Sequence, residues 1–134
     1  MIGWVGDIEE RTEDNATFRT VEFTGEHLQL TVMSIPPGES IGKELHGDTD
    51  QFLRIEAGRG RVEFGRSEDT VDETHEVGDG DAIVVPAGVW HDVVSVGDED
   101  LRLYSLYAPP HHPDGTVQRT KADAEAAEKA EAGA

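Results

Sequence analysis

The sequence contains no cysteine, and this absence limits the chemistry that its 134 residues can support. Without thiols there is no disulfide, no zinc finger, no thiolate metal site and no cysteine nucleophile. Any bound metal ion must therefore be held by nitrogen and oxygen atoms. The length fits one domain, because typical domains run to roughly 100–150 residues, and it suffices to bury a core without cross-links.

Basic residues are also scarce, with 11 Lys+Arg against 29 Asp+Glu and a net charge of −18. This charge repels phosphate backbones and anionic lipid headgroups, so we expect neither nucleic acid nor a membrane surface as a partner. Only three basic residues are lysines, namely Lys43, Lys121 and Lys129. Such an excess of carboxylates is typical of halophilic surfaces. It predicts unfolding when salt is diluted, and indifference to salt would count against it.

Long apolar runs are missing as well. The longest stretches, such as residues 82–85, are far too short to span a bilayer. Residues 1–7 show neither the basic region nor the apolar segment of a secretion signal. We therefore expect a cytoplasmic protein.

Glycine, by contrast, is plentiful, with 15 copies, and most of the glycines and of the 6 prolines separate short β-type runs. No amphipathic helix of useful length interrupts these runs, which argues against alternating strands and helices. Seven or eight short strands with close turns predict an all-β sandwich or barrel. The runs are 18–23, 28–35, 41–46, 51–56, 61–64, 82–85, 90–96 and 101–107.

The last residues, 117–134, differ in composition. Thr120 to Asp123 has the form of a capping box, and alanine, glutamate and lysine follow. Because the apolar positions are all alanine, little area can be buried there. We expect a short helix or a disordered tail behind a single domain of residues 1–116, whose motif core is 38–95.

Four polar residues are expected to meet inside the barrel. Strand alternation places Glu44 and His46 on one face, and the chain returns after a turn so that Gln51 faces the same interior. His91 begins a strand after the Pro-x-Gly turn at 86–88. Together they offer two imidazoles, a carboxylate and an amide oxygen, a set that suits iron, manganese, nickel, zinc or copper.

Each of these residues also has a simpler interpretation. Glu44 would be tolerated inside a barrel if it were paired with an arginine or lysine, and outside the ligand set it could serve as a general base. Gln51 could orient a histidine instead of touching the metal. His111 and His112 are adjacent in a proline-flanked turn, where surface exposure is expected.

The first of these segments resembles a motif of the cupin superfamily, in which a Gly, five residues, His-x-His, three or four residues, Glu, six residues and Gly follow one another. The matching residues are Gly38, Glu44, His46, Gln51 and Gly58, at the same spacings. Glu44 stands where the first histidine is usual and Gln51 where the glutamate is usual. The formal charge of the ligand set is thus unchanged at −1, but one donor is a weaker, neutral amide.

The second segment resembles the other cupin motif, in which a Gly, five residues, Pro-x-Gly, two residues, His, three residues and Asn follow one another. Here Gly80, Pro86, Gly88 and His91 match, and Ser95 replaces the asparagine. The resemblance covers roughly residues 18–110. Over this range the sequence is similar to small single-domain cupins of the cupin_2 type. Such proteins are often labelled mannose-6-phosphate isomerase-like.

This resemblance implies a double-stranded β-helix, or jelly-roll barrel, with a divalent metal bound by Glu44, His46, Gln51 and His91. It implies a small-molecule substrate or ligand and a homodimer, for which the apolar N-terminal residues Ile2, Trp4 and Val5 could supply contacts. Cupins host isomerases, lyases, dioxygenases and non-catalytic binders. A metal-dependent enzyme and a binding or structural protein therefore both remain open.

Overall fold

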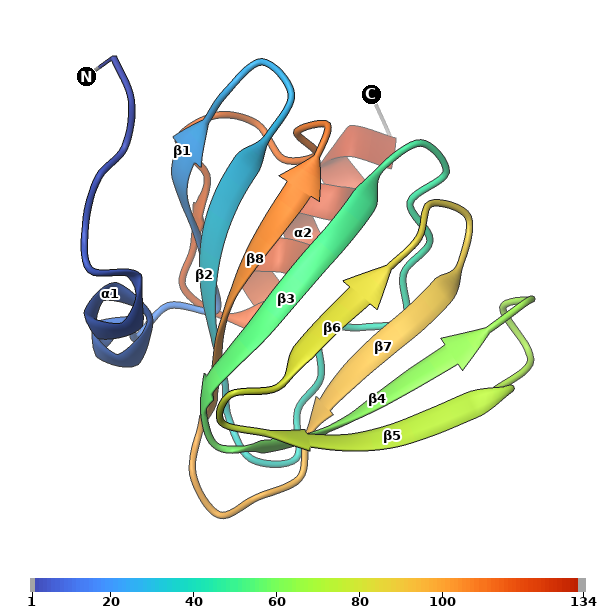
Figure 1. The fold of residues 1–134 in the computed structure, drawn as a ribbon. Helices are drawn as coiled ribbons and strands as arrows, with labels where there is room; N and C mark the ends of the chain where they lie inside the picture. Colours follow the sequence, from blue (N-terminus) through green and yellow to red (C-terminus); the bar gives the residue numbers. More distant parts are fainter. Residues whose placement is uncertain (1, 133–134) are drawn as a thin grey trace.

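The computed structural model describes residues 2–132. It consists of two groups of antiparallel strands and two short helices (Figure 1). In chain order the elements are α1 (Ile8–Asp14), β1 (Arg19–Thr24), β2 (Gln29–Ile35), β3 (Asp50–Ala57), β4 (Arg59–Gly65), β5 (Glu73–Gly78), β6 (Ala82–Val85), β7 (Trp90–Ser95), β8 (Leu101–Ala108), β9 (Val117–Gln118) and α2 (Lys121–Ala132). The expectation of an all-β fold with a short C-terminal helix is confirmed.

The strands form a six-stranded sheet in the order β6-β3-β8-β2-β1-β9 and a three-stranded sheet in the order β5-β4-β7 (Figure 1). Along β8 the buried side chains are Leu101, Leu103, Ser105 and Tyr107, so every second residue faces the interior. The same alternation buries His91 and two further residues of β7. Side chains from both sheets thus meet in one core.

The predicted strand at 41–46 is wrong as a continuous strand. In the part of the chain that is described, the segment makes one isolated bridge, Glu44 to His91, and Ser40 just before it makes another, to Val94. Gly42 lies between them with φ of 90°, a left-handed conformation that breaks the ladder. The segment still runs along β7, and this contact brings the two motifs together.

Three elements have no counterpart among the predicted runs: α1, β5 and β9. Helix α1 has only seven residues; it begins where Asp7 accepts a hydrogen bond from the Glu10 amide, and it packs against β8, β3 and β2. Strand β5 is an edge strand with mostly exposed polar residues. Neither α1 nor β5 carries enough apolar periodicity to be recognised in the sequence.

The C-terminal segment is joined to the domain at both of its elements. Strand β9 pairs with β1, and α2 begins with the capping box, in which Thr120 and Asp123 exchange hydrogen bonds of 3.1 and 3.3 Å. Ala124 is only 5% exposed and belongs to the core cluster, so the helix packs more closely than its alanines led us to expect. Within residues 2–132, neither helix has the length and apolarity needed to cross a membrane.

Candidate metal centre

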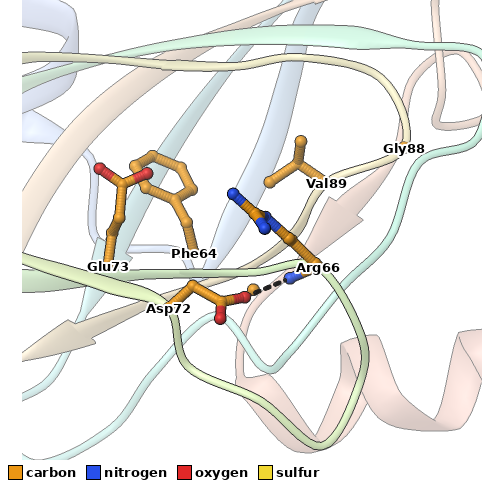
Figure 2. A pocket seen from close by; sticks show the side chains of 7 residues that line it. Phe64, Arg66, Asp72, Glu73, Gly88 and Val89 are labelled. Atoms are coloured by element: carbon orange, nitrogen blue, oxygen red, sulfur yellow. Dashed lines mark hydrogen bonds between the residues drawn. The ribbon is translucent and has the colours of Figure 1, made fainter.

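An open cavity of about 540 Å³ lies between the β4–β5 hairpin and the turn before β7 (Figure 2). Phe64 and Val89 line it together with the charged residues Arg66, Asp72 and Glu73. Asp72 accepts a 2.8 Å hydrogen bond from the backbone amide of Arg66, which shapes the hairpin loop. No histidine lines the cavity, so the predicted metal site lies elsewhere.

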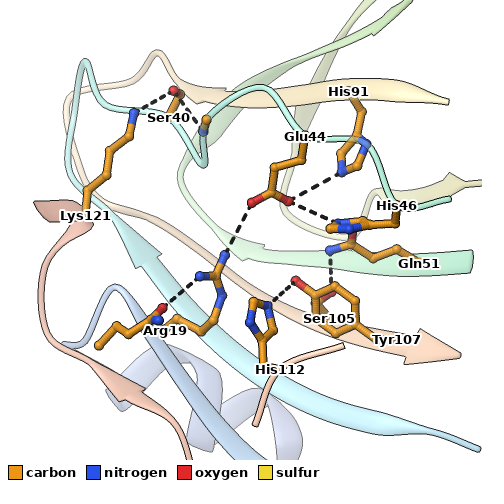
Figure 3. Close-up of polar contacts among 12 residues, drawn as sticks. Arg19, Ser40, Glu44, His46, Gln51, His91, Ser105, Tyr107, His112 and Lys121 are labelled. Atoms are coloured by element: carbon orange, nitrogen blue, oxygen red, sulfur yellow. Dashed lines mark hydrogen bonds and ion pairs between the residues drawn. The ribbon is translucent and has the colours of Figure 1, made fainter. Parts of the chain in front are cut away.

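The predicted polar residues lie on the inside of the barrel (Figure 3). Oε2 of Glu44 is 3.1 Å from Nε2 of His46 and 3.8 Å from Nε2 of His91. One ligand atom from each of these three residues lies within 4.8 Å of the others. Within residues 2–132, this is the one group of three or more histidines and acids that could hold a metal ion.

Backbone hydrogen bonds hold the two motif segments in register at this point. The amide of Glu44 donates to the carbonyl of His91 at 2.9 Å, and the amide of His91 donates back at 3.0 Å. One turn away, the amide of Gly88 donates to the carbonyl of His46 at 2.8 Å. Gly88 has φ of 82°, which only glycine adopts easily. The Pro-x-Gly turn therefore fixes both histidines relative to each other.

The side chains carry the charges that a metal ion requires. Burial acts to raise the pKa of the Glu44 carboxyl, but the hydrogen bond from His46 and the charge of Arg19 outweigh it and hold the pKa below its usual value. Burial lowers the pKa of His91, so its imidazole is favoured in the neutral form that binds metals. Nδ1 of His91 donates to the carbonyl of Val89 at 3.1 Å, which directs Nε2 toward Glu44.

The donor set fits a divalent transition metal. Metal–ligand bonds of roughly 2.0–2.2 Å place neighbouring ligand atoms about 3.0–3.4 Å apart, close to the 3.1 and 3.8 Å found around Glu44. Nε2 of His91 is buried and has no hydrogen-bond partner among residues 2–132. An unpartnered buried nitrogen is costly, and a metal ion would satisfy it.

Gln51 lies beside this group on β3 and is 2% exposed. Its Nε2 donates to Oγ of Ser105 at 2.8 Å, while Oε1 is buried and has no partner in the described part of the chain. The amide is thus oriented by Ser105 with its oxygen still unsatisfied. Its role as a fourth ligand stays a prediction.

The loop after β8 brings two further histidines to the barrel mouth. His111 is exposed, as expected, but its ring centroid lies 4.1 Å from that of His46. His112 is half-buried, which corrects the expected exposure, and its Nε2 lies 3.4 Å from the hydroxyl of Tyr107. Buried Gln29 holds the loop by accepting both histidine amides at 3.1 and 2.9 Å. Because these contacts join distant residues, no local pattern announced them.

Arg19 is the member of this candidate site that the sequence analysis missed. It is 2% exposed, its Nη2 lies 3.8 Å from Oε1 of Glu44, and its Nη1 donates to Oε1 of Gln118 at 2.8 Å. Figure 3 shows the Glu44 carboxylate between this guanidinium and the two imidazoles. The alternation with buried Val21 was a usable signal, because it places Arg19 inside. The expected pairing of Glu44 with an arginine or lysine thus holds for its Oε1, whereas its Oε2 faces the two histidines.

Comparison with known families gives the decisive observation for this architecture. Residues 31–107, more than half of the chain, match the model of the cupin domain. The chain belongs to the cupin domain family. Two of its departures from the usual motifs, Glu44 and Gln51, lie inside the barrel beside the two motif histidines.

Individual proteins support this assignment. This cupin is 55% identical over 125 residues to the uncharacterized protein YrkC of Bacillus subtilis, covering 93% of the chain and 67% of YrkC. It is 39% identical over 115 residues to the uncharacterized protein L612 of Acanthamoeba polyphaga mimivirus, covering 85% of the chain and 70% of L612. The crystal structure of BH2720 from Bacillus halodurans superposes with a TM-score of 0.91 at 52% identity, covering 92% of this chain and 93% of that one.

Proposed function

We propose that this cupin binds a divalent transition metal through Glu44, His46 and His91, with the oxygen of Gln51 as a fourth donor, and that the centre acts on a small organic molecule. The observation that carries the proposal is the convergence of three ligand atoms within 4.8 Å around a buried, unpartnered imidazole nitrogen. Iron, manganese, nickel, zinc and copper all suit such nitrogen and oxygen donors.

A bound metal would supply Lewis acidity to a carbonyl or enolate oxygen, and the surrounding residues would orient the substrate. Burial raises the pKa of Tyr107 to about 12, so its hydroxyl keeps its proton. Burial, together with the charge of Arg19, lowers the pKa of His112 to about 3. Both groups therefore stay neutral and present hydrogen-bonding atoms at the mouth. Isomerase or lyase chemistry and dioxygenase chemistry fit this arrangement equally.

A non-catalytic binding protein is the second candidate. It is favoured by the Arg19 contact, since a carboxylate 3.8 Å from a guanidinium is partly neutralised without any metal. The neutral amide of Gln51 in place of the usual carboxylate points the same way. Against it stand two motif histidines, which a purely structural barrel would replace with apolar side chains.

Metal analysis of protein purified without a histidine tag tests the proposal. We expect near-stoichiometric transition metal in the wild type and in His75→Ala, a control on exposed strand β5, and none in His46→Ala or His91→Ala. Equal metal content in all four proteins would refute the site. Oxygen-uptake assays with diketones and flavonols, run beside carbonyl-isomerisation assays, would then separate the enzyme classes.

A homodimer and a cytoplasmic location stay predictions for this cupin. The side chains of Ile2 and Val5 are almost fully exposed and available for contact with a second copy. Light scattering at working salt concentration tests the dimer, and a monomer would contradict it.

A further inference from the structure

The guanidinium of Arg19 is buried with incomplete hydrogen bonding. One nitrogen donates to the neutral oxygen of Gln118 at 2.8 Å, and a second lies 3.8 Å from Glu44, which is beyond hydrogen-bond distance. Its Nε is buried without a hydrogen-bond partner among residues 2–132. Arginine carries five N–H donors in a planar fork that matches a carboxylate. The guanidinium also interacts with the hydroxyl of Tyr107, so the Nε–H is the donor that stays unused in a place where leaving it unused is costly.

The charge balance also leaves room for an anion. Within the described chain, the one ion pair of Arg19 is with Glu44. If Glu44 neutralises part of a divalent metal, the metal with one carboxylate and neutral imidazoles keeps a net charge of about +1, and Arg19 adds another positive charge. A buried excess of positive charge is stable only with a counter-ion. Because the whole chain carries −18, this interior differs sharply from the surface around it.

A small cavity of about 80 Å³ adjoins these two residues. Arg19, Glu44, Lys43 and Lys121 line it, and so do the acidic residues of α2, Glu125 and Glu128. The lining thus contains three cations and three acids, with the ammonium groups of Lys43 and Lys121 donating to Thr70 and Ser40, and the charge of the lining becomes positive once Glu44 is committed to a metal. Roughly 10–15 Å³ of such volume is enough to hold one water molecule, so the cavity has room for a carboxylate group.

We propose that Arg19 binds the carboxylate of the substrate, and that the substrates of this cupin are small organic acids. The inference rests on the proposed metal centre, which takes up the charge of Glu44. Arg19 would hold the acid group while the rest of the molecule reaches the metal. The competing view is that Arg19 serves only as the structural counter-ion of Glu44.

Calorimetric titration of glycolate and of glycolamide into the cobalt-loaded protein tests this proposal. The two probes share their heavy-atom framework and differ in charge. We expect glycolate to bind at least about tenfold more tightly than glycolamide and to change the visible spectrum of the cobalt. Equal affinity for the two probes would overturn the inference, and this comparison needs only the wild type.

Variants then assign the effect to Arg19. Arg19→Gln should bind glycolate at least about tenfold more weakly, and Arg19→Lys, which keeps the charge and loses the fork, by an intermediate factor. Arg59→Gln, on an exposed side chain of β4, should bind it like the wild type. Unchanged glycolate affinity in Arg19→Gln would overturn the proposal. If circular dichroism shows that Arg19→Gln is unfolded, Arg19→Lys and the two probes decide.

These experiments can refute the metal centre and the carboxylate-binding role of Arg19 independently of each other. Cobalt binding without preference for glycolate would leave the metal centre standing and refute the role of Arg19. Absence of cobalt binding would refute the proposed function. In that case the metal-free protein decides about Arg19: glycolate binding lost in Arg19→Gln would support an anion site, and no glycolate binding would refute it.

Discussion

The two ends of the barrel interior are equally buried but chemically opposite. On β3, Gln51 is 2% exposed and Leu53 is 0% exposed; on β7, His91 and Val93 are both 0% exposed. On β3 the inward residues thus change from polar to apolar, whereas on β7 Val93 lies between His91 and the buried Ser95. The difference lies in bonding, since the polar end holds buried atoms of His46, Gln51 and His91 that lack hydrogen-bond partners within residues 2–132. Such atoms also occur elsewhere, for example on Thr31 and Ser95, so the site is marked by ligand atoms of Glu44, His46 and His91 that converge within 4.8 Å.

The two ends therefore make different contributions to folding. The apolar end releases water from aliphatic side chains and supplies net stability. Its largest buried members are Met33, Ile35, Leu53, Ile55, Leu101 and Leu103. The polar end desolvates Arg19 and Glu44, a step that a long ion pair only partly offsets. Stability that the apolar end supplies thus offsets the cost of burying this ion pair.

Removing one charge at the polar end gives the largest expected effect. Glu44→Leu should lower the free energy of unfolding of the metal-free protein by about 3–5 kcal/mol, because Arg19 is left buried without a counter-charge. The double variant Arg19→Met/Glu44→Leu should recover most of this loss, since both charges are gone. Urea unfolding in the presence of a chelator measures both. A double variant as unstable as the single one would show that the ion pair is not the source.

Truncation at the apolar end should be nearly as costly but should leave the site intact. Leu103→Ala removes a fully buried side chain and should lower the free energy of unfolding by about 2–5 kcal/mol. Metal content per folded molecule should match the wild type. A parallel loss of metal binding would mean that the two ends are coupled, contrary to the comparison.

Much of this contrast was visible in the sequence. Alternation and motif spacing predicted that His46, Gln51 and His91 would be buried, and the structure places all three inside. The strand at 82–85 was predicted with its observed bounds. These features depend on local periodicity and on fixed spacing, which a linear sequence records directly.

The features that the sequence did not reveal depend on contacts between distant segments. Arg19 reaches Glu44 across the barrel, and Gln29 on β2 holds His111 and His112 after β8. Gly42 ended a predicted strand through a positive φ that its neighbours do not announce. Contacts between distant segments therefore determine the details of the barrel mouth, whereas the local pattern of residues was enough to predict the barrel.

The polar end can be sharpened by restoring a carboxylate. Gln51→Glu should raise the affinity for a divalent metal by about tenfold, because an anionic oxygen replaces a neutral one near the three other donors. The same change should destabilise the metal-free protein, since two carboxylates would then share the interior. Chelator competition measures the affinity. Unchanged affinity would place Gln51 outside the ligand set.

Acid sensitivity at the mouth gives the smallest expected effect. Burial, together with Arg19, lowers the pKa of His112 to about 3 in the folded protein, whereas an unfolded histidine titrates near 6.5. The unfolded state thus binds an extra proton between these values, so the contribution of His112 is full above about pH 6.5 and falls as the pH drops toward 3.

In chelator, His112→Gln should therefore lose less stability than the wild type between pH 7.5 and 5, by about 1 kcal/mol after allowance for its partial exposure. His27→Gln, whose side chain is 85% exposed, is the matched control and should follow the wild type. Parallel pH profiles for all three proteins would mean that His112 takes up a proton while folded. The barrel mouth would then take up protons as the surface does. The contrast between a neutral polar interior and its charged surroundings would be limited to Glu44, His46 and His91.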